Sequence, residues 1–490
     1  MKLNHIYKSI ACGVLLAMTA TSCDLDYNPV DTYSDVTEGV NKTDEKPIFN
    51  SVQDVETSMV TLHKKFRDRQ EHWYVDKLLI GDAHSDNAYA GTTGAEVVPY
   101  ETNSIEGSNS VLKRDWDRFL GDIAVANRII VGCDQLKALS ESERGKYQSQ
   151  AKIFRAMVMF DMVRLWGNFP VITTVGGDIT EDNVEEMYPT YFPPQNTAEE
   201  AYAQIEKDLT EAVENPRAML AKVYAEKPLR DYAKVIKYAD ELAADGFDLV
   251  EDFSDLWAYD TEKKDCRVRN TKEAILEAHF PPGSGNWCTW MFGRNLSNWD
   301  ESFTWAKWIT PSRDLIRLYE EQGDTKRYNE SVVWYDCGWS NYYPADHYAF
   351  MYKCRSAFNS IIYLRYADIL LLKAEAKIMG ETPDLNGAAD IIDRIRNRAG
   401  LGKLPQSTRS SKEALLQAYM DERRMELAFE GQRWYDLCRL NKVEEVMNAV
   451  YAKDSGRHAQ ENLFNENSYL LAIPQGAIDQ NENLIQNPGY

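Results

Sequence analysis

A pair of amphipathic helices joined by a short polar turn is the feature that most constrains the fold. Residues 361–379 place apolar side chains at spacings of three and four, namely Leu364, Ala367, Leu371, Ala374 and Ile378. This spacing predicts one buried face of a helix. Residues 386–399 predict a second helix, with Asn386 as its N-cap and Gly400 as its C-terminal stop.

Earlier segments repeat this pattern of paired helices. The pairs are 146–166 with 197–214 and 217–226 with 230–245. Thr197 and Glu200 have the spacing of a capping box at the start of one of these helices. Two helices of this length with a short connection match a tetratricopeptide-like hairpin of ~34 residues.

Alternation of apolar and polar residues, which predicts strands, is scarce in this chain. Short strands are predicted at 170–175, 247–250 and 469–473. We therefore predict a mainly α fold, in which tetratricopeptide-like helix pairs form a scaffold. A long irregular, loop-rich region near 281–355 and a few short strands complete this prediction.

The N-terminus has the pattern of an export signal. Lys2 and Lys8 precede an apolar run over 10–20, which has the length of a signal-peptide core. Small residues then lead to Cys23, as in a bacterial lipobox, so we expect cleavage after residue 22 and acylation of Cys23. Ordinary secretory cleavage, with Cys23 incidental, is the alternative. Residues 23–50 are polar, which predicts that they form a tether to the folded body.

Charge and composition exclude several classes of protein. The chain has 55 Lys and Arg against 77 Asp and Glu, a net charge of −22, which disfavours nucleic-acid binding. The mean hydropathy is −0.51, and the body of the chain lacks an apolar run long enough to span a bilayer. The cysteines are widely spaced without a CxxC pair, and the seven His show no metal-ligand spacing, so neither a metal nor a cofactor is expected. Export permits disulfides, but no pairing follows from the sequence.

Tryptophan is concentrated in one region of the chain. Seven of the twelve Trp lie there: Trp287, Trp290, Trp299, Trp305, Trp308, Trp334 and Trp339. Flat aromatic faces on loops suit carbohydrate, because a pyranose has an apolar C–H face that stacks on a ring. We predict Trp287, Trp290 and Trp299 as ligand contacts and place Trp305 and Trp308 in the core. The alternative is that the aromatic rings only attach long loops to the body.

A second candidate for ligand contact is the glycine-bounded loop 81–91. Asp86, Asn87 and Tyr89 supply polar groups and one aromatic ring, and Trp73, eight residues before the loop, is a candidate stacking platform. The alternative is an Asx-rich loop whose side chains bond its own backbone.

The run from 422 to 434 is dense in charge and is predicted to be structural. Its members are Glu422, Arg423, Arg424, Glu426, Glu430, Arg433 and Trp434. Acidic residues four apart with arginines close by favour ion pairs between helices. A direct contact with a partner protein is the alternative for this motif.

Several segments of the C-terminal third carry a family resemblance. They are IIYLRYADILLLKAEA (361–376), IIDRIRNRAGL (391–401), DERRMELAFEGQRWYDLCRL (421–440), YLLAIP (469–474) and QNPGY (486–490). Together with 152–173, 197–209 and 308–328, they resemble the SusD/RagB family of nutrient-uptake lipoproteins in Bacteroidetes. The resemblance implies a signal peptide (1–22), a lipidated tether (23–50), a SusD-like N-terminal region with tetratricopeptide-like helices (51–260) and a C-terminal domain with the aromatic insert (265–490).

The resemblance also implies a function. Such proteins are held by lipid on the outer face of the outer membrane, and they capture oligosaccharides for a SusC-like TonB-dependent transporter. In the RagB branch the cargo is peptide, which is the alternative for this chain. No catalysis is implied. A glycoside hydrolase with paired carboxylates and a lid without its own ligand are the other function classes to compare.

Overall fold

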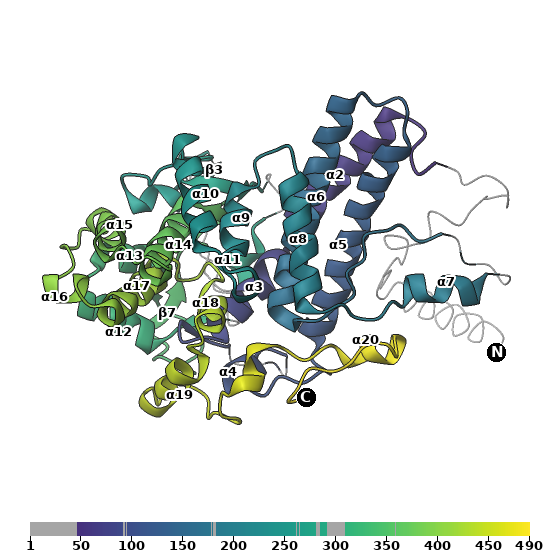
Figure 1. Cartoon of the computed structure of the whole chain (residues 1–490). Coiled ribbons are helices and arrows are strands. Elements are labelled where there is room, and N and C mark those ends of the chain that lie inside the picture. The colour runs from purple at the N-terminus through teal and green to yellow at the C-terminus, as the bar shows by residue number, and fades with distance from the viewer. Residues whose placement is uncertain are drawn as a thin grey trace, which may run out of the picture. The chain divides into compact units, whose positions relative to one another are not determined.

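Long helices of the first half of the chain pack side by side (Figure 1). The structure, a computed structural model, describes residues 47–490 apart from 92–93, 95, 178, 180–182, 261, 264, 281–284, 292–308 and 358, with the backbone alone at 290–291. The helices of this half are α2 (Val52–Asp68), α4 (Val98–Thr102), α5 (Ser110–Gln135), α6 (Glu141–Trp166), α7 (Val184–Tyr191), α8 (Ala198–Glu211), α9 (Arg217–Val223) and α10 (Tyr232–Ala244). Helix α6 packs between α5 and α8, and α9 packs on α10, so both predicted helix pairs are confirmed.

Capping boxes begin three of these helices, α2, α6 and α8. The Thr197 hydroxyl accepts from the Glu200 backbone N–H at 3.3 Å, and the Glu200 carboxylate accepts from the Thr197 N–H at 2.9 Å, as predicted. Ser140 and Glu143 make the same reciprocal pair at the start of α6. Each box satisfies backbone donors that the first turn of a helix leaves without partners.

The C-terminal half continues the helical scaffold. Its helices are α12 (Arg313–Gln322), α13 (Thr325–Ser331), α14 (Tyr366–Met379), α15 (Leu385–Arg398), α16 (Gln406–Arg409), α17 (Lys412–Glu426), α18 (Arg433–Arg439), α19 (Val443–Lys453) and α20 (Gln475–Gln480). Helices α14 and α15 form the predicted hairpin. The N-cap of α15 is Asp384, whose carboxylate accepts from the Gly387 N–H at 2.9 Å, and not Asn386. Gly400 follows this helix with φ of 81°, as expected of a C-terminal stop.

Short helical segments connect the longer helices. They are η3 (Glu71–Val75), α3 (Asp76–Leu78), η4 (Leu79–Ala83), η5 (Lys227–Leu229), η6 (Phe253–Leu256), α11 (Trp287–Met291) and η8 (Glu466–Tyr469). The turns η3 and η4 are π-helical and lie on either side of α3. Such widened turns occur frequently at functional sites.

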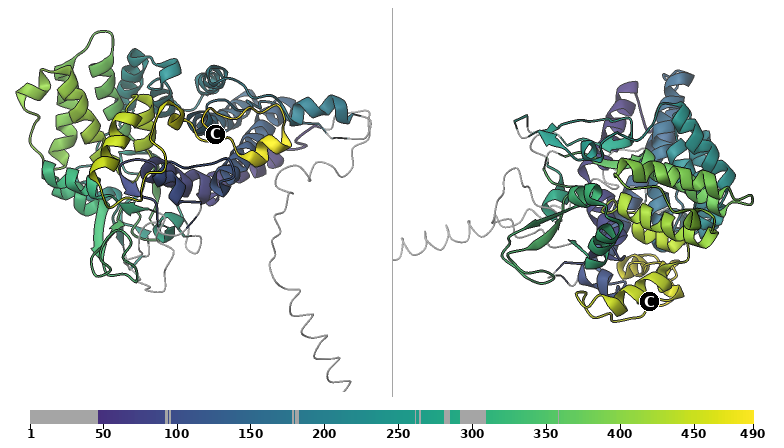
Figure 2. Two further views of the ribbon diagram at one scale, coloured as in Figure 1. Left: turned by 90° about the horizontal axis from the view of Figure 1, so that it is seen from below. Right: turned by 90° about the vertical axis from the view of Figure 1, so that its left-hand side faces the viewer.

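Strands pair only in twos among the described residues, and every pair is antiparallel. The pairs are β1 (Ala88–Tyr89) with β5 (Thr310–Pro311), β2 (Tyr259–Asp260) with β3 (Asp265–Cys266), β4 (Ala274–Ala278) with β8 (Ile361–Arg365), and β6 (Val332–Tyr335) with β7 (Tyr348–Met351). Figure 2 shows the hairpin of β6 and β7 extending from the green helices.

The strand predictions need correction. Residues 170–175, 247–250 and 469–473 contain no strand, although Phe169 makes an isolated bridge with Asn196. Residues 361–365, predicted as the start of a helix, instead form β8, because their backbone groups pair with the distant β4. The mainly helical architecture is confirmed, while the described part of the region 281–355 is more regular than predicted, since it holds β5 to β7 and the helices α11, α12 and α13.

Residues 47–490 form a single unit, in which α10 packs against α14 and β4 pairs with β8. The boundary predicted between 260 and 265 falls inside this unit. Residues 1–46, with the predicted signal peptide and Cys23, lie outside the described residues. Among the helices that the structure describes, none combines the length and apolar character needed to cross a membrane.

Candidate functional site

A cluster of buried charges around Glu426 fixes the elements that carry the site. The Arg365 guanidinium lies 2.5 Å from Glu426 Oε1, and Arg327 lies 3.0 Å from Oε2. Arg398 also forms an ion pair with Glu426, whose side chain has no exposed surface. Burial alone would raise the pKa of Glu426, but the three guanidinium groups hold this pKa well below its usual range.

These arginines connect elements that are remote in sequence. Arg365 ends β8 and also pairs with Glu273 and Glu430, at 2.8 and 2.7 Å. Arg398 ends α15 and lies 2.6 Å from Glu273. Arg327, on α13, lies 2.7 Å from Glu422. The acidic residues of the 422–434 motif thus join α13, α15, α17 and β8 in the interior.

The arginines of the same motif bind the loop 81–91. Arg433 forms a two-point ion pair with Asp86, with N–O distances of 2.8 and 2.9 Å. Arg424 donates to Asn87 Oδ1 at 2.9 Å. The arginines hold the pKa of Asp86 well below its usual range, although burial would raise it. Arg423 turns the other way, to Asp436 at 2.6 Å.

Asp82, in the same loop, clamps the turn that follows α17. Its carboxylate accepts from the backbone N–H groups of Phe429 and Gly431 at 3.0 and 2.8 Å, and from Asn87 at 2.8 Å. Phe429 has φ of 61°, a conformation that a bulky residue adopts only under external restraint. Gly81 approaches so closely that an added Cβ would lie 2.4 Å from the Gly431 backbone.

The ligand contacts predicted for this loop are therefore corrected. Asp86, Asn87 and Tyr89 are buried, so they offer no open face to a shallow ligand. The Tyr89 hydroxyl donates to Asp454 at 2.7 Å, and its ring stacks on Tyr342. The alternative of an inward-bonded Asx-rich loop describes the structure, with side chains of other elements as the main partners.

Trp73, the predicted stacking platform, is also buried. Its indole N–H donates to Asp122 Oδ2 at 3.0 Å, and Phe66 and Tyr363 pack edge-on against its ring. A sugar cannot reach either face of a ring enclosed in this way, which corrects the predicted role of Trp73.

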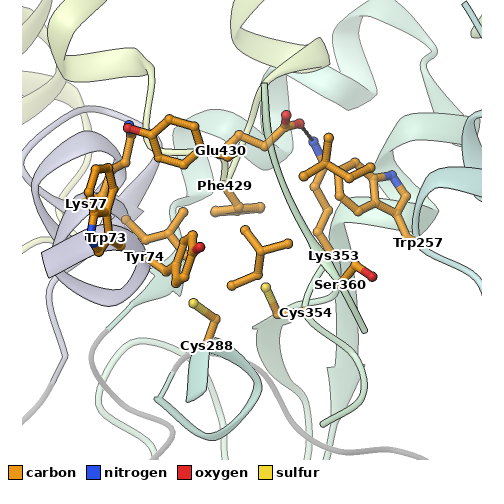
Figure 3. A pocket seen from close by; sticks show the side chains of 14 residues that line it. Trp73, Tyr74, Lys77, Trp257, Cys288, Lys353, Cys354, Ser360, Phe429 and Glu430 are labelled. Atoms are coloured by element: carbon orange, nitrogen blue, oxygen red, sulfur yellow. Dashed lines mark hydrogen bonds and ion pairs between the residues drawn. The ribbon is translucent and has the colours of Figure 1, made fainter. Parts of the chain in front are cut away.

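A small cavity lies beside Trp73 (Figure 3). Aromatic and aliphatic side chains line the cavity, and the side chains of Lys77 and Lys353 line it too. Burial lowers the pKa of Lys77 to about 7. Lys353 pairs with Glu430 at 2.6 Å. The space open to the centre of a water molecule is about 50 Å³, enough for about three to five waters, so the cavity is too small for a hexose.

The open aromatic surface lies instead on the hairpin of β6, β7 and residues 336–347, here called the aromatic hairpin. The Trp334 ring stacks in parallel on the exposed His347, with centroids 4.2 Å apart. Tyr335, the next residue, is 42% exposed. Trp339 is half-buried and packs edge-on against Tyr348. Trp334 and Trp339 belong to the Trp-rich region but are not among the predicted ligand contacts, and neither are Tyr335 and His347.

Trp287 lies half-buried at the start of α11. Gln70 holds the backbone there: its side-chain carbonyl accepts from the Trp287 N–H and its amide donates to Gly285 O, both at 2.8 Å. Trp299, Trp305 and Trp308 lie outside the described residues, and so does the side chain of Trp290. The predicted ligand contacts at Trp287, Trp290 and Trp299 therefore stay predictions.

Buried residues anchor the aromatic hairpin to the body. The Tyr342 hydroxyl donates to Glu101 at 2.9 Å and lies 2.9 Å from His458 Nδ1. Glu101 also accepts from the His458 backbone N–H at 2.9 Å. Hydrogen bonding to Glu101 raises the pKa of the half-exposed His458. This anchor lies beside the stacked rings of Tyr89 and Tyr342.

No group of His, Cys, Asp and Glu side chains in the described part of the chain could hold a metal ion. The aromatic hairpin itself offers ring surface for stacking at Trp334, His347 and Tyr335.

Comparisons with known proteins agree with this architecture. Residues 355–490 match the model of the SusD family. Over 97% of this chain and 98% of its own, "SusD-like protein P2" of Formosa agariphila is 23% identical, and a SusD-like protein of Bacteroides ovatus is 24% identical over 87% and 81%. Among solved structures, a SusD homolog from Bacteroides thetaiotaomicron has a TM-score of 0.72 at 19% identity, covering 92% of this chain and 99% of its own.

Two of the similar structures are of proteins named for the glycans that they bind. The surface glycan-binding protein A from Bacteroides fluxus has a TM-score of 0.71 at 21% identity, and a laminarin-binding SusD-like protein has 0.68 at 20%. Each covers 90% of this chain and all of its own. At these identities the likeness shows the fold.

Replacing Glu426 by Gln should strongly destabilise the protein. The substitution removes the negative charge that three buried guanidinium groups share, and breaking a buried ion pair costs about 3–5 kcal/mol. The free energy of unfolding from urea denaturation measures this loss. The control is Glu445→Gln, since Glu445 pairs with Lys442 at an exposed site, where changes stay within about 0.5 kcal/mol. Equal effects of the two substitutions would show that the Glu426 cluster is not a structural centre.

The anchor at His458 should make stability depend on pH. Because its pKa is raised in the folded state, protonated His458 stabilises the fold below its unfolded pKa of about 6.5, and this contribution is lost as the pH rises through the folded pKa. The difference in unfolding midpoint between wild type and His458→Gln should therefore be larger at pH 6 than at pH 9. The same substitution in a Glu101→Gln background is the control and should remove most of this pH dependence. A difference that grows with pH would refute the assignment.

Proposed function

We propose that this chain, whose residues 355–490 match the model of the SusD family, is a SusD-like protein that captures an oligosaccharide nutrient and passes it to a SusC-like TonB-dependent transporter. Acylation at Cys23 would hold the protein on the outer face of the outer membrane. A lipid-anchored chain needs no spanning helix, because several acyl chains give durable attachment.

The exposed part of the aromatic hairpin is the observation that carries this proposal. Tyr335, the Trp334–His347 stack and the half-buried Trp287 present ring surface near the protein exterior. An aromatic face packs on the apolar C–H face of a pyranose, and neighbouring polar groups can bond its hydroxyls. The glycan-binding and laminarin-binding descriptions of two similar structures support the same ligand class.

The geometry of the site favours weak and reversible binding. The described cavity beside Trp73 is too small for a sugar, so the ligand would be held on a surface that leaves much of it in water. Shallow binding of this kind typically has a Kd between μM and mM, roughly −8 to −4 kcal/mol. Weak binding suits transfer, because a tightly held ligand would not be released to a transporter.

Alanine substitutions at Tyr335 and at the three predicted tryptophan contacts test the proposal. A glycan array first identifies a ligand, and isothermal titration then measures its Kd. Trp287→Ala, Trp290→Ala, Trp299→Ala and Tyr335→Ala should each raise Kd roughly two- to tenfold where the ring stacks, since such a contact is worth about 0.5–1.5 kcal/mol. The unfolding midpoint of Tyr335→Ala should stay near that of wild type, because its ring is 42% exposed.

Tyr188 provides a matched control. It is 39% exposed on α7, which Figure 1 places on the opposite side of the described unit from β7, so Tyr188→Ala should leave Kd unchanged. Normal binding by all four site variants would show that the site is misplaced. Binding of peptides in place of glycans would favour the peptide-capturing alternative, and turnover of a bound glycan would favour a hydrolase.

A further inference from the structure

Two cysteine thiols face the same small cavity from different segments of the chain. Cys288 lies on α11 and is buried, while Cys354 follows β7 and is half-buried. Figure 3 shows both sulfur atoms pointing into the cavity, on the side away from Lys77 and Glu430. Both thiols are free in this structure.

Hydrogen bonds hold the two backbone segments side by side. The Asn286 N–H donates to Ala357 O at 3.0 Å, and the Asn286 amide donates to Asn359 O at 3.0 Å. The Thr289 hydroxyl donates to Ser356 O at 2.8 Å. Asn286 and Thr289 lie on either side of Cys288, and their partners follow Cys354 by two to five residues, so the two cysteine-bearing segments lie close together, as a disulfide requires.

The pKa of the Cys288 thiol also reflects its proximity to Cys354. Burial raises the pKa of its thiol well above the usual value, and a hydrogen bond with the Cys354 thiol raises it further. Cys288 is therefore a protected thiol at neutral pH, and the half-buried Cys354 is the better placed of the two to meet an oxidant.

We propose that Cys288 and Cys354 form a disulfide once the protein reaches an oxidising compartment. The oxidant is another disulfide, such as that of a dithiol oxidase. The Cys354 thiolate attacks one sulfur of the oxidant, which gives a mixed disulfide and releases one thiolate. The Cys288 thiolate then attacks the Cys354 sulfur and releases the second thiolate. Two cysteine thiols thus lose two electrons and two protons, and the oxidant becomes two thiols.

The bond would close the segment that carries the proposed ligand surface. Trp290, Trp299 and the whole aromatic hairpin lie between residues 288 and 354. A cross-link at the two ends of this segment restricts its unfolded conformations and stabilises the folded base. This consequence for capture rests on the proposed function, whereas formation of the bond does not.

Oxidation of the mature protein tests the inference. The protein is incubated with oxidised glutathione or with dithiothreitol, quenched in acid, denatured and alkylated, and its peptides are mapped by mass spectrometry. With oxidised glutathione, we expect the peptides of Cys288 and Cys354 to be joined, and the unfolding temperature to rise by several degrees over the reduced form. Dithiothreitol should reverse both changes.

Variants separate this bond from other thiol chemistry. Cys288→Ser and Cys354→Ser should each lose the rise in unfolding temperature, while Cys438→Ser should keep it. Full alkylation of Cys288 and Cys354 after oxidation, or a disulfide between Cys354 and any other cysteine, would overturn the inference. Neither result depends on a glycan, so failure here leaves the proposed function standing, and failure of glycan binding leaves the disulfide standing.

Discussion

The carboxylate of Glu426 forms ion pairs with three guanidinium groups in the interior, and the C-terminal half of the chain packs around this cluster. The arginines come from α13, β8 and α15, and Glu426 itself ends α17. Charges removed from water cost free energy that their partners offset, so a packing that separated these four elements would leave buried charges unpaired. Apolar packing could hold these elements with less cost, but it would specify their mutual placement less strictly.

The 422–434 motif also connects the charge cluster to the surface of the protein. Glu430 binds Arg365 and also Lys353, at 2.6 Å, which fixes the chain between β7 and β8. Arg433 and the Asp82 clamp hold the loop 81–91 against the turn after α17. Tyr89 in that loop stacks on Tyr342 of the aromatic hairpin. A continuous set of contacts thus leads from the charge cluster to the aromatic hairpin.

The helix pairs were predictable because their signal is local. Apolar spacing of three and four defines α14, and capping residues three apart define the start of α8. Strands were not predictable in the same way, since β8 depends on pairing with the distant β4, where Ile361 lies opposite Ala278 and Arg365 opposite Ala274. From the sequence alone, residues 361–365 fit the first turn of the following helix as well as they fit a strand.

The candidate site shows the same division. The concentration of Trp drew attention to the region that holds the aromatic hairpin, because composition is visible without a fold. Asp86 and Asn87 were misassigned, since small polar residues in a glycine-bounded loop are typical of ligand contacts, and their arginine partners lie 347 and 337 residues away. Only the tertiary structure shows that these polar groups are already paired.

The central claim is that the ligand stacks on aromatic side chains at the protein surface and does not reach the buried ones. The indole N–H signals in a nitrogen–proton NMR spectrum test this claim most directly. Titration with a bound glycan should shift the signals of Trp287 and Trp334, which are half-buried. The fully buried Trp73, Trp166 and Trp434 serve as internal references and should keep their positions. Shifts confined to the buried indoles, with Trp287 and Trp334 unmoved at saturation, would contradict the account.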